Sequence, residues 1–215
     1  MEHTCHIVGA APLDGRLPHP GPGDYVIAAD AGYTALEAAG IRPDLVMGDF
    51  DSLGHAPAHP NVLTHSPVKD DTDLILALRW ALERGWKRFA IYGALGGKRL
   101  DMTVASFQTL RFLAGRGAKA TLFGAGWNVT LLHNGALRFP AGSKGFLSIF
   151  VSGAAARGVT LRGLKYTLED ASLSCDYPMG VSNDFLGGDA LVQVTDGCLY
   201  VLWQDDGAAP EEVSL

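Results

Sequence analysis

Residues 43–52 read PDLVMGDFDS, and this short stretch indicates the fold class. Its apolar run, Leu45–Met47, leads into Gly48, and two aspartates follow, Asp49 and Asp51, with one residue between them. An apolar run of this kind is typical of a strand that is covered on both faces. The segment therefore predicts a buried strand of a parallel sheet, with carboxylates directly beyond its carboxyl end.

Similar apolar runs recur on both sides of this segment, as far as about residue 125, and amphipathic segments lie between them. Alternating strands and helices indicate a parallel α/β sheet with right-handed crossovers. The expected strands are Cys5–Ala10, Tyr25–Asp30, Asp44–Gly48, Asn61–His65, Arg88–Gly93 and Lys119–Gly124.

Two amphipathic segments are expected to form helices of this sheet. The first, Asp73–Arg84, has apolar residues at the i, i+3, i+4 spacing of one helix face and ends before Gly85. The second, Asp101–Ala114, ends before Gly115. Its apolar stripe is expected at Val104, Phe107 and Leu110.

The pattern changes after Gly126, where helical periodicity stops and short apolar strands follow one another. Asp196-Gly197 is a two-residue hairpin signal between two of them. The chain is therefore expected to have an N-terminal parallel α/β domain at 1–126 and a C-terminal antiparallel β domain at 127–215. The expected strands of the second domain are Val129–His133, Leu147–Val151, Leu191–Thr195 and Leu199–Trp203.

Acidic residues gather at one predicted edge of the sheet. Each follows a strand or opens a helix just beyond one, and ligands of open α/β sheets bind outside the carboxyl ends of the strands. Clustered carboxylates repel one another unless a proton or cation neutralises them, and Mg²⁺ prefers carboxylates, waters and substrate phosphates. The cluster therefore predicts a magnesium site. Its members are Asp30, Asp49, Asp51, Asp71, Asp73 and Asp101.

These aspartates also have a purely structural interpretation. An aspartate at a helix N-terminus caps backbone N–H groups and interacts favourably with the helix dipole, which suits Asp71, Asp73 and Asp101. Asp49 and Asp51 would then belong to an ordinary turn. All of these positions fall at one edge of the predicted sheet, and this favours the metal site over the structural interpretation.

The segment Gly93–Arg99 reads GALGGKR and follows a predicted strand. It is not a P-loop, because three residues instead of four separate Gly93 from Gly97, and Arg99 stands where a hydroxyl residue is required. A glycine-rich turn before a helix can still hold phosphate through backbone N–H groups, with Lys98 and Arg99 neutralising charge. The alternative is a tight turn with two solvated basic side chains.

Bulk composition limits the kinds of partner. The chain has 215 residues and a net charge of −6, which disfavours an extended nucleic-acid or acidic-membrane surface. Three widely spaced cysteines favour a reduced, cytoplasmic protein, and no signal peptide or membrane span is recognisable. We therefore expect no nucleic-acid or membrane partner.

Several motifs, taken in order, resemble those of the thiamine pyrophosphokinase family over nearly the whole chain. The departures from the family pattern are Ala31 for a glycine, the additional Lys98, Met102 for a histidine and Ser106 for an asparagine. They concern the nucleotide contacts and leave the aspartates intact. The matching segments are ADAG at 29–32, PDLVMGDFDS at 43–52, KDDTD at 69–73, GALGG at 93–97 with RLD at 99–101, GLKY at 163–166 and SN at 182–183.

The resemblance implies an α/β nucleotide-binding domain followed by a β-sandwich, in a homodimer whose active sites lie at the subunit interface. It implies ATP and Mg²⁺ at the mouth of the sheet, and thiamine near Ser182 and Asn183. The metal ligands would be Asp49, Asp51 and Asp73. The nucleotide would be bound by Asp30, Gly93, Gly96, Gly97, Lys98 and Arg99.

The implied reaction transfers pyrophosphate from ATP to the hydroxyethyl group of thiamine and releases AMP. Arg99 would stabilise phosphate charge, and Asp71 or Asp101 would orient the nucleophile. The expected catalytic residues are Asp51, Asp71, Asp73, Arg99 and Asp101. Two alternatives stay open: a pyrophosphokinase for another heterocyclic alcohol such as a pterin, and a thiamine-phosphate binding protein without turnover.

Overall fold

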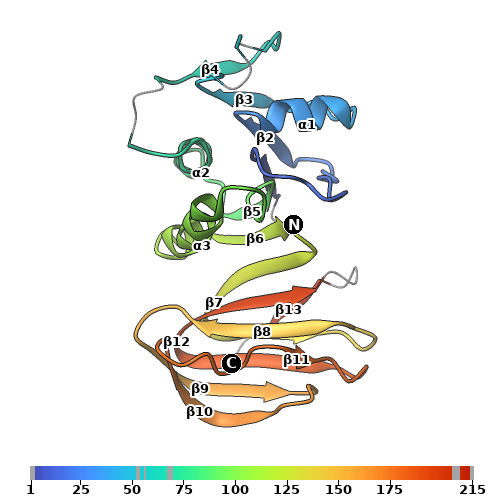
Figure 1. Cartoon of the computed structure of the whole chain (residues 1–215), viewed down its shortest axis with the longest axis vertical. Coiled ribbons are helices and arrows are strands. Elements are labelled where there is room, and N and C mark those ends of the chain that lie inside the picture. The colour runs from blue at the N-terminus through green and yellow to red at the C-terminus, as the bar shows by residue number, and fades with distance from the viewer. Residues whose placement is uncertain (1–2, 52–53, 56, 67–69, 205–208, 214–215) are drawn as a thin grey trace. The chain divides into compact units, whose positions relative to one another are not determined.

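The structure, a computed structural model of the chain, describes residues 3–51, 54–55, 57–66, 70–204 and 209–213. It divides into two compact units, Met1–Ala125 and Gly126–Leu215, and each is described by itself. Figure 1 shows helices among the strands of the first unit and an all-strand second unit. No helix within the described ranges is long and apolar enough to cross a membrane.

The first unit is built on a parallel sheet with the order β4-β3-β2-β1-β5-β6. In its centre Ile7 pairs with Ile27 on one side and with Ile91 on the other, and all three side chains are buried. This confirms the predicted parallel sheet. The strands are β1 (Cys5–Val8), β2 (Tyr25–Ala29), β3 (Leu45–Gly48), β4 (Val62–Thr64), β5 (Arg88–Tyr92) and β6 (Lys119–Gly124).

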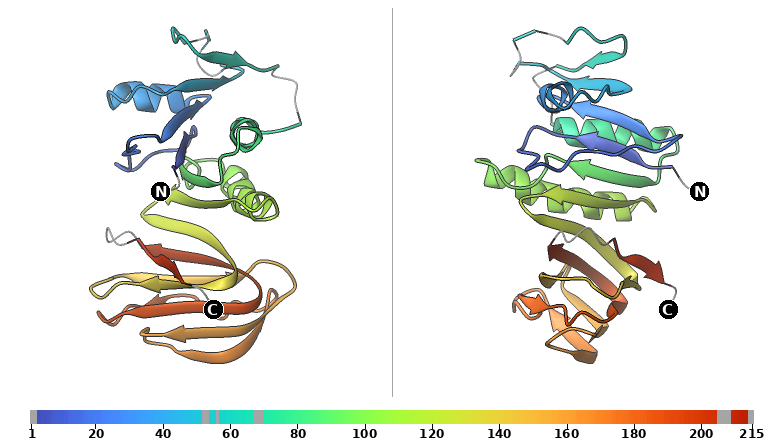
Figure 2. Two further views of the ribbon diagram at one scale, coloured as in Figure 1. Left: turned by 180° about the vertical axis from the view of Figure 1, so that it is seen from behind. Right: turned by 90° about the vertical axis from the view of Figure 1, so that its right-hand side faces the viewer.

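Helices cover both faces of this sheet. Figures 1 and 2 show α1 (Gly32–Ala38) on one face, and α2 (Asp73–Glu83) and α3 (Leu100–Ala114) on the other. The predicted face of α2 is confirmed at Ala77, Leu78 and Ala81, which are its buried residues. Burying this stripe against the sheet is what holds α2 in place.

The predicted apolar stripe of α3 is wrong at Val104, which is exposed, and right at Leu110, which is buried. The predicted positions were three residues apart, and a helix turns about 100° per residue, so Val104 and Leu110 lie roughly 120° apart around the axis. The observed stripe has the 3–4 spacing that keeps side chains on one face. Its buried residues are Ser106, Thr109, Leu110 and Leu113.

The strand order reverses at β1. The chain moves outward from β1 through β2 and β3 to β4, then returns to place β5 on the other side of β1, followed by β6. From this point the chain continues from β1 to β2 on one side and from β5 to β6 on the other, and open α/β sheets bind ligands beyond the carboxyl ends of the strands at such a reversal.

The second unit consists of antiparallel strands around one core. The two long strands β7 and β12 pair along their length, with an irregularity in register between Val194 and Cys198. The first half of β12 also pairs with β9, and the second half of β12 also pairs with β8. The strands are β7 (Trp127–Phe139), β8 (Phe146–Val151), β9 (Ala155–Arg162), β10 (Leu168–Ser174), β11 (Asn183–Asp184), β12 (Ala190–Gln204) and β13 (Glu211–Val213).

The strands of the second unit bury their apolar side chains in a single core, as the strands of a β-sandwich do. Phe139 packs against Trp203 with ring centroids 5.6 Å apart, and Val192, Ile149 and Leu161 belong to the same buried cluster. The α/β fold followed by an antiparallel β unit confirms the predicted fold class.

The hairpin predicted at Asp196-Gly197 is wrong. Both residues lie inside β12, and the ladder to β7 resumes at Cys198 opposite His133. Gly197 has a positive φ of 116°, and its N–H donates to Asn134 Oδ1 at 2.9 Å. The dipeptide therefore forms an irregularity within a continuous strand, because β7 offers a pairing partner on both sides of it.

Candidate active site

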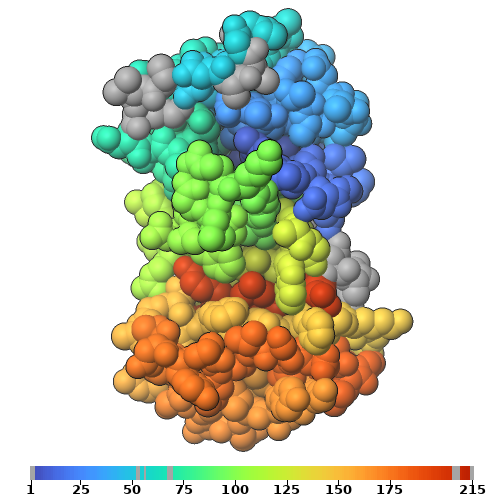
Figure 3. Space-filling view, in the orientation of Figure 1, coloured from blue at the N-terminus to red at the C-terminus, as the bar shows by residue number. Residues whose placement is uncertain are grey.

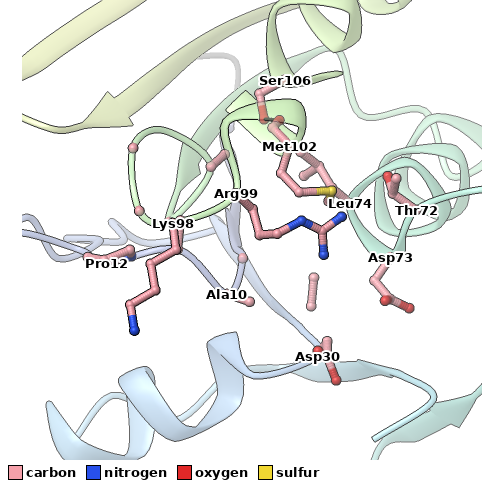
Figure 4. Close-up of a pocket in the computed structure, with 17 residues that line it drawn as sticks. Ala10, Pro12, Asp30, Thr72, Asp73, Leu74, Lys98, Arg99, Met102 and Ser106 are labelled. Carbon is pink, nitrogen blue, oxygen red and sulfur yellow. Dashed lines mark hydrogen bonds between the residues drawn. The ribbon is translucent and has the colours of Figure 1, made fainter. Parts of the chain in front are cut away.

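A cavity of about 400 Å³ lies at the reversal of strand order in the first unit. It is formed by the segments that follow β1, β2 and β5 and by the first turns of α2 and α3. Figure 4 shows charged side chains from three of these segments around the same space. Its lining residues are Gly9, Ala10, Ala11, Pro12, Ala29, Asp30, Thr72, Asp73, Leu74, Gly93, Ala94, Gly96, Gly97, Lys98, Arg99, Met102 and Ser106.

The glycine-rich turn after β5 forms one wall of this pocket. Gly93, Gly96 and Gly97 all have positive φ values, of 61°, 73° and 77°, which residues other than glycine adopt only with strain. Thr103 in α3 fixes the turn, because its Oγ1 accepts a hydrogen bond from Gly96 N–H at 3.1 Å. The turn therefore has a defined shape, and the N–H of Gly96 is used within the protein.

Lys98 and Arg99 bring positive charge to the pocket. Arg99 is the N-cap residue of α3, so its backbone leads directly into the helix. In Figure 4 its side chain extends across the pocket toward Thr72 and Asp73, while Lys98 extends in another direction. Both residues line the pocket, and their predicted role in neutralising the phosphates of ATP stays a prediction.

Two of the predicted aspartates, Asp30 and Asp73, line the pocket. Asp30 follows β2 in the left-handed conformation with φ 49°, and its N–H donates to Met47 O at 2.7 Å. A Cβ on Gly48 would lie 3.0 Å from Asp30 Cα, so the glycine of the PDLVMGDFDS segment leaves room for this aspartate. Asp73 is the first residue of α2, after the N-cap Thr72, whose Oγ1 accepts from Ile75 N–H at 3.3 Å.

Asp49 and Asp51 are not among the described residues that line the pocket. They follow β3, where Asp49 Oδ1 accepts the N–H of Asp51 at 3.2 Å. Phe50 between them has a positive φ of 59° and a buried ring, so this turn is anchored in the core. Ser52 and Lys69, which belong to the predicted motifs, lie outside the described residues.

Asp71 and Asp101 each pair with an arginine. Asp71 Oδ2 lies 2.6 Å from Arg79 Nη1, and Asp101 binds Arg99 through both carboxylate oxygens, at 2.9 and 2.6 Å. The hydrogen bond from Arg99 is the main cause that lowers the pKa of Asp101, and the same contact raises the pKa of Arg99. Both groups of this second pair therefore stay charged over the physiological range.

No group of three or more His, Cys, Asp or Glu side chains within the described ranges could hold a metal ion by itself. The predicted set of Asp49, Asp51 and Asp73 is therefore not assembled as a closed protein site. At phosphate sites Mg²⁺ is usually bound by one or two carboxylates together with waters and substrate phosphates, and the three metal ligands stay a prediction.

Sequence reasoning missed the segment Gly9–Pro12, which lines the pocket after β1, and the roles of Leu74 and Thr103. The rule that collected the aspartates, ligand binding beyond carboxyl ends of parallel strands, also applies to Gly9 and its neighbours. They escaped notice because they carry no charged side chain. The contact of Thr103 with Gly96 had no local signal in the sequence.

The residues predicted to bind thiamine lie in the second unit. Ser182 is exposed and has a positive φ of 56°. Asn183 is only 1% exposed, and its side-chain amide makes two hydrogen bonds with the backbone of Tyr166. Its Oδ1 accepts from Tyr166 N–H at 2.9 Å, and its Nδ2 donates to Tyr166 O at 2.6 Å. Asn183 therefore fixes the turn that carries Tyr166, whose own side chain is 60% exposed.

A parallel α/β unit with a charged pocket at its switch point has the arrangement in which open α/β sheets bind ligands beyond their strands. The sequence matches "Thiamin pyrophosphokinase, catalytic domain" over residues 22–122 and "Thiamin pyrophosphokinase, vitamin B1 binding domain" over residues 137–199. The chain belongs to the thiamin pyrophosphokinase family.

Similar proteins agree with this assignment. A thiamine pyrophosphokinase from Bacillus subtilis is 28% identical over 196 residues, covering 84% of this chain and 87% of that protein. A crystal structure of thiamine pyrophosphokinase from the same species aligns with a TM-score of 0.81 at 26% identity, over 94% of this chain and 99% of that chain. The Geobacillus thermodenitrificans structure gives a TM-score of 0.79 at 26% identity, over 95% and 98%.

Proposed function

We propose that the protein transfers the pyrophosphoryl group of ATP to the hydroxyethyl oxygen of thiamine, giving thiamine diphosphate and AMP. One observation carries the proposal: Asp30, Asp73, Lys98 and Arg99 line a single pocket at the switch point of the sheet. Such a pocket offers carboxylates to a metal and cations to a polyphosphate. The family assignment supplies the acceptor.

In the proposed step the thiamine hydroxyl oxygen forms a bond to the β-phosphorus of ATP. The bond between that phosphorus and the oxygen bridging to the α-phosphate breaks, AMP leaves with the bond electrons, and the hydroxyl proton is released. Positioning and charge stabilisation account for most of the catalysis of such transfers. Arg99 would interact with charge on the transferred group, since its side chain extends across the pocket.

The donor chemistry of the pocket fits Mg²⁺, a hard cation that prefers oxygen ligands. Asp73 lines the pocket, and Asp49 and Asp51 follow the neighbouring strand β3. These three would hold the metal together with substrate phosphates, and Asp30 is a fourth carboxylate at the same edge. Bound Mg²⁺ would supply charge neutralisation of the triphosphate.

Thiamine would be bound with the help of the second unit. Figure 3 shows the segment 163–186, in orange, at the surface of that unit. Ser182 and the Tyr166 ring are exposed there, and Asn183 holds the Tyr166 turn from within. An exposed aromatic ring suits a heteroaromatic cation such as the thiazolium of thiamine.

The protein would work as a homodimer. Large apolar side chains are exposed on β8 and on the segment beside it, where Ile149 N–H donates to Gly180 O at 2.9 Å. Such a patch on a described surface is typical of an interface with a second copy. Sedimentation of the wild type as a monomer at working concentration would contradict this. The exposed side chains are Phe146, Phe150, Tyr177, Met179 and Val181.

The three cysteines, Cys5, Cys175 and Cys198, are free thiols, which supports a cytoplasmic location, where ATP is available.

The proposal is tested by offering the purified protein ATP and Mg²⁺ with thiamine, with a hydroxymethylpterin, or with neither, and resolving the products by mass. Of the three reactions, only the one that contains thiamine is expected to form a diphosphate product together with AMP, and that product is thiamine diphosphate. A pterin diphosphate would favour the alternative acceptor. Binding of thiamine phosphates without any new product would show that the chain is a binding protein.

A further inference from the structure

Arg99 and Asp101 form a side-on, two-point ion pair at the edge of the pocket. Arg99 Nε donates to Asp101 Oδ1 at 2.9 Å, and Nη2 donates to Oδ2 at 2.6 Å. Arg99 is the N-cap residue of α3 and Asp101 lies in its first turn, so one short segment carries both partners. A planar guanidinium held at two atoms has its plane and direction set.

This geometry leaves one edge of the guanidinium for a ligand. The pair uses Nε and one hydrogen of Nη2, which are two of the five N–H donors of an arginine. The opposite edge, formed by Nη1 and the second hydrogen of Nη2, is the fork that binds phosphate oxygens two at a time. In Figure 4 the guanidinium reaches the middle of the pocket, toward Thr72 and Asp73.

The pair contributes little to the stability of the fold. Its side chains are 71% and 63% exposed, and ion pairs in that setting are screened by solvent. Asp101 is not the N-cap residue of α3, which is Arg99, although its carboxylate also interacts with the backbone N–H of Met102 in the first turn. The favourable interaction of a carboxylate with the helix dipole remains, but it does not require contact with Arg99.

We propose that Asp101 is a positioning residue that orients Arg99 for the polyphosphate of the nucleotide, and that it contacts neither the nucleophile nor the metal. The proposal rests on the proposed function for the identity of the ligand. It distinguishes Asp101 from Asp73, which lines the pocket itself, whereas Asp101 is not among the described lining residues. Asp101 then acts only through Arg99.

A double-mutant cycle tests this dependence. The variants are Asp101→Asn, Arg99→Gln and the double variant, and the measurement is equilibrium binding of α,β-methylene-ATP with Mg²⁺, followed by steady-state turnover. The matched control is Glu169→Gln, because Glu169 binds Arg162 in the same two-point manner in the second unit. Thermal unfolding of every variant checks that the fold is retained.

Asp101→Asn is expected to weaken binding of the nucleotide analogue by roughly 3- to 5-fold, because the orienting effect cannot exceed the strength of an exposed ion pair. In the Arg99→Gln background it should change nothing further. The Mg²⁺ concentration for half-maximal binding and the KM for thiamine should stay at the wild-type values. Glu169→Gln should bind the nucleotide analogue like the wild type.

Three results would overturn the proposal. Multiplicative effects of the two substitutions would show that Asp101 acts independently of Arg99. A raised Mg²⁺ requirement in Asp101→Asn would make it a metal ligand, and a loss of kcat with unchanged analogue binding would make it a partner of the nucleophile. Because the binding cycle needs no turnover, it reports on the pair even if the wild type forms no thiamine diphosphate.

Discussion

Gly9 and Gly93 approach each other so closely that neither can carry a side chain. A Cβ on Gly9 would lie 2.6 Å from Gly93 O, and a Cβ on Gly93 would lie 2.4 Å from Gly9 O. The two glycines directly follow β1 and β5, the strands between which the order of the sheet reverses. Ala11 N–H then donates to Gly93 O at 2.9 Å. This contact forms the floor of the pocket.

Replacing Gly93 with alanine should therefore damage both stability and the pocket. Gly93 has φ 61°, so the alanine would carry left-handed strain and a clash with backbone, together more than about 3 kcal/mol of unfolding free energy. Gly117→Ala is the matched control, because Gly117 has φ 64° and a Cβ added there would meet nothing within 4 Å. It should lose only about 1 kcal/mol. Equal losses in urea unfolding would show that the Gly9–Gly93 contact is not restrictive.

Magnesium should stabilise the protein mainly together with the nucleotide. The described residues offer no closed group of three ligands, so the metal needs phosphate oxygens to complete its coordination. Thermal unfolding should shift little with Mg²⁺ alone and clearly with Mg²⁺ plus α,β-methylene-ATP, because a ligand that binds only the folded state raises its stability. Asp73→Asn should remove most of the magnesium-dependent part of that shift. A large shift with Mg²⁺ alone would contradict this view of the site.

Asn183→Ala should destabilise the second unit, whereas Ser182→Ala should not. Removing the amide leaves the N–H and O of Tyr166 without their partner inside the protein, at a cost of about 2 kcal/mol. Ser182 is exposed, and its backbone bond to Ser148 Oγ does not involve its side chain. We expect the Asn183→Ala variant to bind thiamine more weakly, because the turn that carries Tyr166 would become disordered. An Asn183→Ala protein as stable as Ser182→Ala would show that this turn holds without the amide.

Asp24 should contribute stability that depends on pH. Its carboxylate accepts the N–H groups of Thr4 and Gly21 at 2.7 and 2.8 Å and contacts His6 at 3.3 Å. The backbone hydrogen bond from Thr4, followed by that from Gly21, lowers the pKa of Asp24. A lowered pKa means that this stability is present above the unfolded pKa of about 3.9 and is lost as pH falls through the folded value.

The measurement compares wild type with Asp24→Asn in urea at several pH values. The Asp24→Asn variant should be less stable than the wild type by about 1–2 kcal/mol at pH 7, because asparagine keeps one acceptor but turns a donor toward the second N–H group. The difference should shrink as the pH falls below about 4. A difference that stays constant down to pH 3 would show that the charge of Asp24 is not involved.

Local patterns predicted most of the first unit. The apolar run before Asp49 and the helix spacing around Leu78 each depend on neighbours a few residues away, and both features appear where expected. The short helix α1 was missed, since its seven residues carry no acidic first turn and no side-chain cap. In the second unit, the Asp196-Gly197 signal is the same for a hairpin and for an irregular strand, and only the distant partner β7 distinguishes them.

The site was predictable to the level of the sheet edge. The rule for parallel strands gathered six aspartates at one edge, and two of them, Asp30 and Asp73, are among the described residues that line the pocket. It could not show that Asp101 pairs with Arg99 or that Asn183 is buried, because both facts depend on side-chain direction and packing. Residues without charge, such as Gly9, shape the pocket through backbone approach, which a search for reactive side chains overlooks.

A single-turnover experiment with enzyme in excess over ATP and with thiamine and Mg²⁺ present tests the central claim most directly. Products are quenched and quantified at successive times. Transfer of an intact pyrophosphoryl group predicts that thiamine diphosphate and AMP appear together, one for one, with no transient thiamine monophosphate. ADP and thiamine monophosphate as the first products would contradict the account.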